Sequence, residues 1–190
     1  MQPRLLKPTH PPVLVLDLDE TLLHSTIDPN TPADFTFGAY KTRLRPHLRE
    51  FLQAIDPWWH VGIFTAAGHL YAQAMLEGIR AHAPFPLEPV FVFDRRRCTP
   101  RQDPDTGETT WLKDLKKVRR RGFNLERVLV LDDRPAGLAR HRGNLLRAPA
   151  WEGDPTDTFL LDVLPTLERL SGVENIRTAS KSLTPSEVTG

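Results

Sequence analysis

The same apolar tetrapeptide, VLVL, occurs twice in this 190-residue sequence, at residues 13–16 and 128–131, and an aspartate follows it each time. A strand that is apolar at every position must be covered on both faces, which is typical of the parallel sheets of α/β proteins. Ligands of such sheets gather at the carboxyl ends of the strands. The repeat therefore predicts an α/β fold in which Asp17 and Asp132 meet at one rim of a parallel sheet.

The remaining apolar segments fit the same architecture. Further short runs that suit buried strands cover residues 60–65, 89–93 and, more weakly, 145–148. Helical spacing of apolar residues is found at 46–55, 70–83, 112–118 and 158–170. The residues of the second helix that we expect to face inward are Leu70, Ala74, Met75 and Ile79. Strands that alternate with helices predict a Rossmann-like fold, a central parallel sheet with helices on both faces.

Two connections between these elements are irregular. Residues 25–45 carry alternating aromatic residues and are expected to form a short hairpin or flap. Residues 98–110 contain the strong turn sequence DPDTG and predict a second hairpin near the rim. Residues 173–190 are rich in Ser, Thr and Glu without periodicity, which predicts a disordered tail. We therefore expect a single domain over residues 1–172, with small hairpin insertions and no large cap domain.

Composition argues against several other classes of protein. The net charge is only +1, so composition alone does not indicate a nucleic-acid binder, although basic residues cluster at 95–97 and 116–121. The single cysteine, Cys98, excludes an internal disulfide and a metal site built from several cysteines. Residues 1–10 lack the apolar core of a signal peptide, and no window approaches the ~18 apolar residues of a membrane span. We expect a cytoplasmic protein with no membrane partner.

The sequence DLDET, which follows the first apolar run, places Asp17 and Asp19 two residues apart at the end of a strand. Carboxylates this close repel one another unless a cation lies between them. Mg²⁺ prefers such an all-oxygen site, with carboxylates, waters and phosphate oxygens as ligands. A solvated turn or a helix cap would explain one acidic cluster. A shared Mg²⁺ also explains the second, Asp132 and Asp133, at the same predicted rim.

Two further positions suit a phosphate group. Thr65 ends a predicted strand and is followed by Ala66, so a hydroxyl and backbone N–H groups at a helix start could bind a phosphate oxygen. Lys113 lies at the start of a predicted helix, where a lysine is unfavourable for the helix dipole and could be held by an anion. Taken alone, such a threonine is more often a helix cap, and such a lysine is more often a surface residue.

Five sequence blocks lie in the order found in the haloacid dehalogenase superfamily of phosphotransferases. They are VLDLDETLLHS, RPHLREFL, IFTAAGHLYA, WLKDL and VLVLDDRPAG, with APAW following, and they span about residues 12–171. Together they resemble the small phosphatase family typified by the RNA polymerase II carboxy-terminal-domain phosphatases. The resemblance implies a Mg²⁺-dependent phosphatase that hydrolyses phosphomonoesters through an aspartyl-phosphate, on a macromolecular substrate such as a protein phosphorylated on Ser or Thr.

The resemblance also implies a role for each motif residue. Asp17 would be the nucleophile that forms the aspartyl-phosphate. Asp19 would be the general acid that protonates the leaving oxygen and then the base that activates water. The residues implied to bind the transferring phosphoryl group are Thr65, Ala66 and Lys113. The implied Mg²⁺ ligands are Asp17, the backbone carbonyl of Asp19, Asp132 and Asp133.

The substrate-facing segments match the family less closely than the catalytic blocks do. Arg95 looks like the family's substrate-contacting arginine, and Ile27 and Tyr71 fall on positions of apolar substrate contacts. The flap is shorter than in relatives, Gly68 replaces a larger residue, and the second hairpin is longer and more polar. Without a large cap domain, the rim should be open to large substrates such as a phosphorylated protein.

Three alternatives stay open at the level of sequence. A phosphatase acting on phosphorylated nucleic-acid ends or on nucleotides would also use acidic motifs and an open rim edged with arginines. A receiver-type phospho-accepting domain uses similar residues, but its acidic pair ends the first strand, whereas here the pair Asp132 and Asp133 comes last. An inactive binding module would not require the complete set of catalytic residues that this sequence contains.

Overall fold

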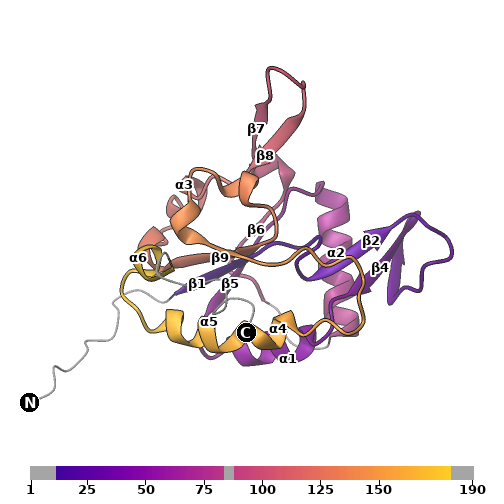
Figure 1. Ribbon diagram of the computed structural model, residues 1–190, viewed down its shortest axis with the longest axis horizontal. Coiled ribbons are helices and arrows are strands. Elements are labelled where there is room, and N and C mark those ends of the chain that lie inside the picture. The colour runs from indigo at the N-terminus through magenta and orange to yellow at the C-terminus, as the bar shows by residue number, and fades with distance from the viewer. Residues whose placement is uncertain (1–11, 84–87, 181–190) are drawn as a thin grey trace, which may run out of the picture.

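A five-stranded parallel sheet forms the centre of the computed structural model, which describes residues 12–83 and 88–180. Its strand order is β10-β9-β1-β5-β6, and each neighbouring pair is parallel. The strands are β1 Val13–Leu16, β5 His60–Phe64, β6 Val92–Phe93, β9 Val128–Asp132 and β10 Leu145–Arg147. The predicted α/β fold with a central parallel sheet is therefore confirmed (Figure 1).

Helices pack against both faces of this sheet. The α-helices are α1 Leu48–Ile55, α2 His69–His82, α3 Lys116–Arg119, α4 Phe159–Asp162, α5 Leu164–Ser171 and α6 Ile176–Ala179. The short 3₁₀ helices are η1 Arg95–Arg97, η2 Leu125–Arg127, η3 Pro135–Leu138 and η4 Arg142–Asn144. Within the described parts of the chain, none of the helices has both the length and the apolar character needed to span a membrane.

The repeated VLVL sequence serves both faces because successive residues of a strand point to opposite sides. The leucines of both tetrapeptides lie in one apolar core with residues of α1, α2, α4 and α5. The valines lie in a second core with Phe64, Phe93 and Val118 of α3. All eight side chains are at most 1% exposed, and the burial of each contributes roughly 1.5–3 kcal/mol. Apolar sequence at every position of the central strands thus follows from two-sided burial.

Two small antiparallel insertions extend from the domain. The strands of the first are β2 Leu23–Thr26, β3 Phe35–Phe37 and β4 Tyr40–Leu44, which form a sheet of order β2-β4-β3. The strands of the second are β7 Thr99–Gln102 and β8 Thr109–Leu112. In Figure 1 the β7–β8 hairpin rises from the top of the domain, and the sheet that contains β2 and β4 extends to the right. Both small insertions lie where the sequence predicts them.

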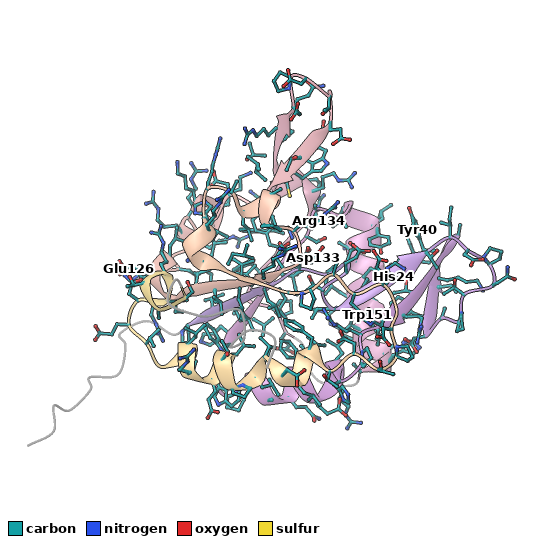
Figure 2. All side chains as sticks on the ribbon, in the orientation of Figure 1. His24, Tyr40, Glu126, Asp133, Arg134 and Trp151 are labelled. Carbon is teal, nitrogen blue, oxygen red and sulfur yellow. The ribbon has the colours of Figure 1, made fainter. Side chains whose placement is uncertain are left out.

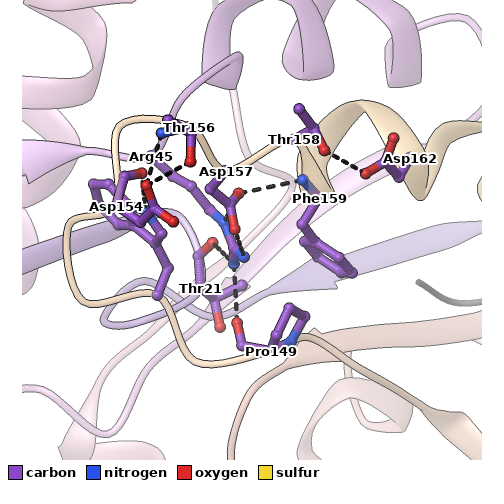
Figure 3. Close-up of polar contacts among 10 residues, drawn as sticks. Thr21, Arg45, Pro149, Asp154, Thr156, Asp157, Thr158, Phe159 and Asp162 are labelled. Atoms are coloured by element: carbon purple, nitrogen blue, oxygen red, sulfur yellow. Dashed lines mark hydrogen bonds and ion pairs between the residues drawn. The ribbon is translucent and has the colours of Figure 1, made fainter. Parts of the chain in front are cut away.

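A buried arginine ties the base of the first insertion to a later loop (Figure 3). Arg45 directly follows β4 and is 1% exposed. Its Nε and Nη2 donate to the two carboxylate oxygens of Asp157, each at 2.8 Å. Its Nη1 donates to the carbonyl oxygens of Thr21 and Pro149, each at 3.1 Å. The guanidinium lies 4.7 Å from the ring centroid of Phe159, so one side chain holds together three separate segments.

The helix predicted over residues 112–118 is wrong in its first half. Leu112 ends β8, where it pairs with the first residue of β7, and α3 begins only at Lys116. The apolar spacing was compatible with a helix, but pairing across the β7–β8 hairpin places this leucine in an extended strand.

Two smaller expectations for the helices also differ from the structure. Residues 158–170 form two short helices, because Pro165 lies in the first turn of α5 and has no N–H with which to continue α4. Leu70 is 71% exposed, although it was expected to face inward. It precedes the buried Ala72 by two residues, which places it about 200° around the helix from that side chain.

The chain after α5 is folded further than its composition predicts. Ile176 of α6 is fully buried, and the Ser180 hydroxyl donates to the carbonyl of Gly143 at 2.7 Å. The Arg127 guanidinium donates to the carbonyl of Val173. The expected disordered tail is therefore wrong for residues 173–180, because one apolar side chain and a few backbone contacts anchor it. Residues 1–11 and 181–190 lie outside the described residues.

Candidate active site

The carboxyl ends of β1, β5 and β9 meet at one rim of the sheet, as parallel pairing requires. Asp17 follows β1, Thr65 follows β5, and Asp132 is the last residue of β9. These three residues and Lys113 line a cavity of about 650 Å³. The expectation that the acidic and hydroxyl side chains share one rim is correct.

The two insertions form the walls of this cavity. Tyr40 lines it from β4, and Trp111 lines it from β8. In Figure 2, Asp133 and Arg134 lie between the β7–β8 hairpin and the strand that carries Tyr40. A substrate that enters here passes between two small sheets, and a large cap domain is absent from the described part of the chain.

The chain turns sharply directly after β1, and this turn explains the spacing of the first two acids. Leu18 is completely buried, and its carbonyl accepts hydrogen bonds from three later backbone N–H groups. Asp17 and Asp19 flank it and both line the cavity. Glu20 completes the turn with φ 57°, a left-handed conformation that costs a non-glycine residue roughly 1–2 kcal/mol. The turn buries the leucine and leaves the two aspartates at the cavity.

Lys113 lies between the two acidic motifs. Its Nζ is 2.8 Å from Asp17 Oδ2 and 2.6 Å from Asp132 Oδ2, and the residue is 3% exposed. Its backbone N–H donates to the carbonyl of Gly137 at 2.8 Å. The expected position at a helix start is wrong, since Lys113 follows β8 and precedes α3 by three residues. What holds this lysine is a pair of carboxylates.

The acidic cluster can supply the ligands of an oxygen-bound cation. Asp17, Asp132 and Asp133 each offer a carboxylate oxygen, and these atoms lie within 4.8 Å of one another. Asp17 Oδ1 is buried and has no hydrogen-bond partner. An unsatisfied buried oxygen is costly, and a hard cation such as Mg²⁺ would satisfy it. The Asp19 carboxylate is not part of this cluster, and its expected contribution through the backbone carbonyl stays a prediction.

The protonation of the cluster is set by burial and by its internal charges. Burial raises the pKa of Asp17 above its usual range, and the charge of Lys113 offsets only part of that rise. Burial and the neighbouring Asp132 raise the pKa of Asp133. Burial alone would lower the pKa of Lys113, but Asp17 and Asp132 outweigh it and raise the pKa to about 12. One lysine supplies a single positive charge to three acids, and a divalent cation at this cluster would favour their ionised forms.

Asp19 is held by a tyrosine that the sequence suggested only as an apolar contact. The Tyr71 hydroxyl donates to Asp19 Oδ1 at 2.5 Å and lies 2.7 Å from Ser25 Oγ. Burial raises the pKa of Asp19, and the hydrogen bond from Tyr71 acts in the opposite direction. The carboxyl group that the sequence suggests as a proton donor is therefore fixed in direction by a residue of α2.

Thr65, Ala66 and Arg95 lie together on the cavity wall. Thr65 Oγ1 accepts a hydrogen bond from the backbone N–H of Ala67 at 3.0 Å, and α2 begins four residues after it. The threonine is therefore not the helix cap. Arg95 Nε donates to the Ala66 carbonyl at 2.7 Å, and its guanidinium lies 5.3 Å from the ring centroid of Trp111.

The residues proposed for substrate contact separate into two groups. Arg95 and Tyr71 line the cavity. Ile27 follows β2, is 70% exposed, and is not among the described residues that line the cavity. A contact through Ile27 stays a prediction that requires a substrate reaching beyond the cavity.

Several residues of the site escaped the sequence analysis. Trp111, Tyr40 and Arg134 line the cavity, although the sequence had suggested no role in the site for these three residues. The available signal was the residue types of the TTWL segment, since β-branched and aromatic residues are enriched in strands rather than helices. Cys98 belongs to the second core, and burial raises its pKa to about 11, so it provides no reactive thiolate at neutral pH.

The sequence matches a known family over most of its length. A family model described as NLI interacting factor-like phosphatase matches residues 12–177. The CTD nuclear envelope phosphatase 1B of Danio rerio is 31% identical over 181 residues, which cover 87% of this chain and 69% of the relative. The human carboxy-terminal domain RNA polymerase II polypeptide A small phosphatase 2 is 31% identical over 175 residues, which cover 87% of this chain and 59% of the relative.

Two solved structures of the RNA polymerase II CTD phosphatase Fcp1 share the fold. One is the fission yeast protein bound to beryllium fluoride, with a TM-score of 0.53 over 89% of this chain and 45% of its own. The other has a TM-score of 0.55 over 94% of this chain and 56% of its own. Both are 20% identical to this sequence. The chain thus spans about half the length of these solved structures, and the likeness concerns the fold.

Proposed function

The chain belongs to the NLI interacting factor-like phosphatase family, and from this premise we propose that it is a Mg²⁺-dependent phosphatase of Ser/Thr-phosphorylated proteins. The observation that carries the proposal is the buried group formed by Asp17, Asp132, Asp133 and Lys113. Within this group Asp17 Oδ1 is buried and has no hydrogen-bond partner, so it is available to a cation.

The proposed reaction has two steps. Asp17 attacks the phosphorus atom, the bond from phosphorus to the ester oxygen breaks, and Asp19 gives its proton to that oxygen. In the second step Asp19 takes a proton from water, the water oxygen attacks phosphorus, and the bond to Asp17 breaks to release inorganic phosphate. The distinct environments of the two acids support these roles, since one pairs with Lys113 and the other receives the Tyr71 hydrogen bond.

The phosphoryl group must be neutralised while a carboxylate attacks it. Lys113 supplies one positive charge at the nucleophile, and the Thr65 hydroxyl lies on the same cavity wall. Asp17, Asp132 and Asp133 would hold Mg²⁺, which neutralises phosphate charge and orients its oxygens when bound. Arg95 is anchored to the Ala66 carbonyl and would meet the substrate at the cavity mouth.

A protein substrate is supported by the shape of the site and by the relatives. The cavity lies between two small antiparallel sheets, and several of its lining residues come from their strands. This arrangement leaves room for the chain on either side of a phosphorylated residue. The similar human protein is described as an RNA polymerase II polypeptide A small phosphatase, which is a phosphatase of a protein.

The test is hydrolysis of an aryl phosphate and of a phosphoserine peptide by the protein and two variants. Asp17→Asn is expected to abolish release of phosphate, whereas Glu20→Gln retains it, although both residues line the same cavity. Circular dichroism confirms that both variants are folded, and chelation of Mg²⁺ is expected to stop turnover. Activity in Asp17→Asn would refute the nucleophile. Hydrolysis of 3′-phosphorylated oligonucleotides in place of the peptide would assign the enzyme to nucleic-acid ends.

A further inference from the structure

The fold brings two distant basic segments of the chain together beside the cavity. Lys117 Nζ donates to the carbonyl of Arg97 at 2.5 Å, which joins α3 to η1. The guanidinium groups of Arg97 and Arg121 each lie 5.7 Å from the ring centroid of Phe93. We call the resulting surface the basic ridge; its residues are Arg97, Lys116, Lys117, Arg119, Arg120 and Arg121.

The charge of the basic ridge is not neutralised within the described residues. All of its side chains are exposed except Lys117, which is half-buried, and none is in an ion pair with a described carboxylate. The nearest acid in sequence, Asp114, is occupied by His141 at 3.1 Å and Arg140 at 3.8 Å. The whole chain carries a net charge of only +1, so this ridge is a local concentration of charge. Figure 2 shows side chains ending in nitrogen extending outward around α3.

A role in stabilising α3 accounts for only part of this pattern. Cations at the end of a helix interact favourably with its dipole, by a few tenths of a kcal/mol up to ~1 kcal/mol each. That effect accounts for Arg119, Arg120 and Arg121 at the carboxyl end of α3. It does not cover Lys116, at the unfavourable first position of the helix, or Arg97, on a different element. A surface that keeps these charges close together gains free energy when an anion binds it.

The ridge is continuous with the cavity through the chain itself. Arg95 lines the cavity and opens η1, and Arg97 closes it two residues later. On the other side, Trp111 and Lys113 line the cavity, and α3 begins three residues beyond the lysine. A substrate segment that leaves the cavity on this side therefore meets the ridge within a few residues, since an extended chain advances ~3.3 Å per residue.

We infer that the substrate is a phosphoprotein segment with further negative charges, acidic side chains or additional phosphates, on one side of the phosphorylated residue, and that the basic ridge binds them. The inference rests on the proposed protein phosphatase function. A peptide suits the ridge better than a single-stranded nucleic acid, because base stacking needs exposed aromatic rings. The aromatic ring beneath the ridge, Phe93, is buried under the guanidinium groups of Arg97 and Arg121 and is not available for stacking.

The experiment compares kcat/KM for three phosphoserine peptides, with acidic residues before, after, or on neither side of the phosphoserine. The substrates are given to the intact protein, to R119Q/R120Q, and to R49Q/R177Q as a control. The control removes two exposed cations from α1 and α6, neither of which belongs to the ridge. An aryl phosphate measures basal activity, since none of these four residues lines the cavity.

We expect one acidic peptide to be preferred at low ionic strength, and R119Q/R120Q to lower its kcat/KM about 4- to 9-fold, roughly two- to threefold per charge. The preference should fade as salt rises. The control variant, the neutral peptide and the aryl phosphate should be unaffected. Equal kcat/KM for all three peptides, or equal losses in both double variants, would overturn the ridge assignment.

The same measurements separate this inference from the function on which it rests. If the aryl phosphate is hydrolysed but none of the peptides is, the protein substrate itself is wrong. If 3′-phosphorylated oligonucleotides are hydrolysed with a dependence on the ridge while peptides are not, the ridge binds nucleic acid and the peptide inference is refuted. Hydrolysis of all three peptides without preference leaves the phosphatase proposal intact and removes only the role of the ridge.

Discussion

Replacing Arg45 by methionine should destabilise the protein by about 3 kcal/mol. It should also raise the concentration of Mg²⁺ that the active site requires. Breaking a buried ion pair from one side costs ~3–5 kcal/mol, because a charge is left without its partner. The Arg45 side chain is fully buried, whereas that of Asp157 is 17% exposed and can recover part of its hydration, so the lower end applies. For a protein of this size, that cost lowers Tm by about 6–12 °C.

The structure provides a matched control on the same strand. Arg43 donates from Nη1 to the carbonyl of Gly153 at 2.7 Å, so it also joins β4 to the loop before α4. It is only half-buried and has no carboxylate partner among the described residues. We expect Arg43→Met to cost about 1 kcal/mol, the usual net value of one hydrogen bond. Urea unfolding at neutral pH measures both variants.

The pair with Asp157 can be separated from the other contacts of Arg45 by a double-mutant cycle. Asp157→Asn leaves the guanidinium buried but still bonded to two carbonyl oxygens, and should cost about 2–3 kcal/mol. The double variant should cost at least ~1 kcal/mol less than the sum, since the two residues are in contact. Additive losses, or a cost for Arg45→Met no greater than that for Arg43→Met, would falsify the reasoning.

An effect on the catalytic site should accompany the loss of stability. Arg45 holds the carbonyl of Thr21, and the Thr21 hydroxyl donates to Asp133 Oδ1 at 3.3 Å. Asp133 is one of the three acids that can hold a cation. Arg45→Met should therefore raise the Mg²⁺ concentration needed for half-maximal activity, measured well below its Tm. Arg43 bonds to the carbonyl of Gly153 and not to that of Thr21, so Arg43→Met should leave that concentration unchanged.

Further predictions concern single side chains. Tyr71→Phe removes the hydrogen bond that orients the Asp19 carboxyl, the proposed proton donor. The variant should lose about 10-fold more activity toward alkyl phosphates than toward p-nitrophenyl phosphate, because the p-nitrophenolate leaving group needs no proton. Hydrogen bonds from Arg96 lower the pKa of Asp94 to about 2, so Asp94 stabilises the fold above its ordinary pKa and loses that contribution as pH falls toward 2. Asp94→Asn should therefore cost about 1 kcal/mol in chemical unfolding at pH 7, a value discounted for the exposed Arg96 partner, and the cost should shrink as pH falls through about 2. Gly62→Ala places a methyl group 2.4 Å from an aromatic ring and should cost about 1–3 kcal/mol in the same assay, whereas Gly68→Ala meets nothing within 4 Å and should be nearly neutral.

The sequence by itself determined the fold class and the acidic rim. Strands buried on both faces must be apolar at every position, and parallel strands must end at the same edge, so the two VLVL segments were sufficient to bring Asp17 and Asp132 together. The small insertions were predictable for a similar reason, because turn residues and alternating aromatic residues act locally.

Only the tertiary structure decided how the remaining parts meet. Lys113 appeared to be at a helix start because apolar spacing over seven residues fits a helix, but pairing of β8 with β7 decides its conformation and aims it at two carboxylates. The Tyr71 hydroxyl, the Arg45 pairing and the basic ridge each join residues at least 20 positions apart. Such contacts depend on how whole elements pack, and local sequence preferences carry no information about them.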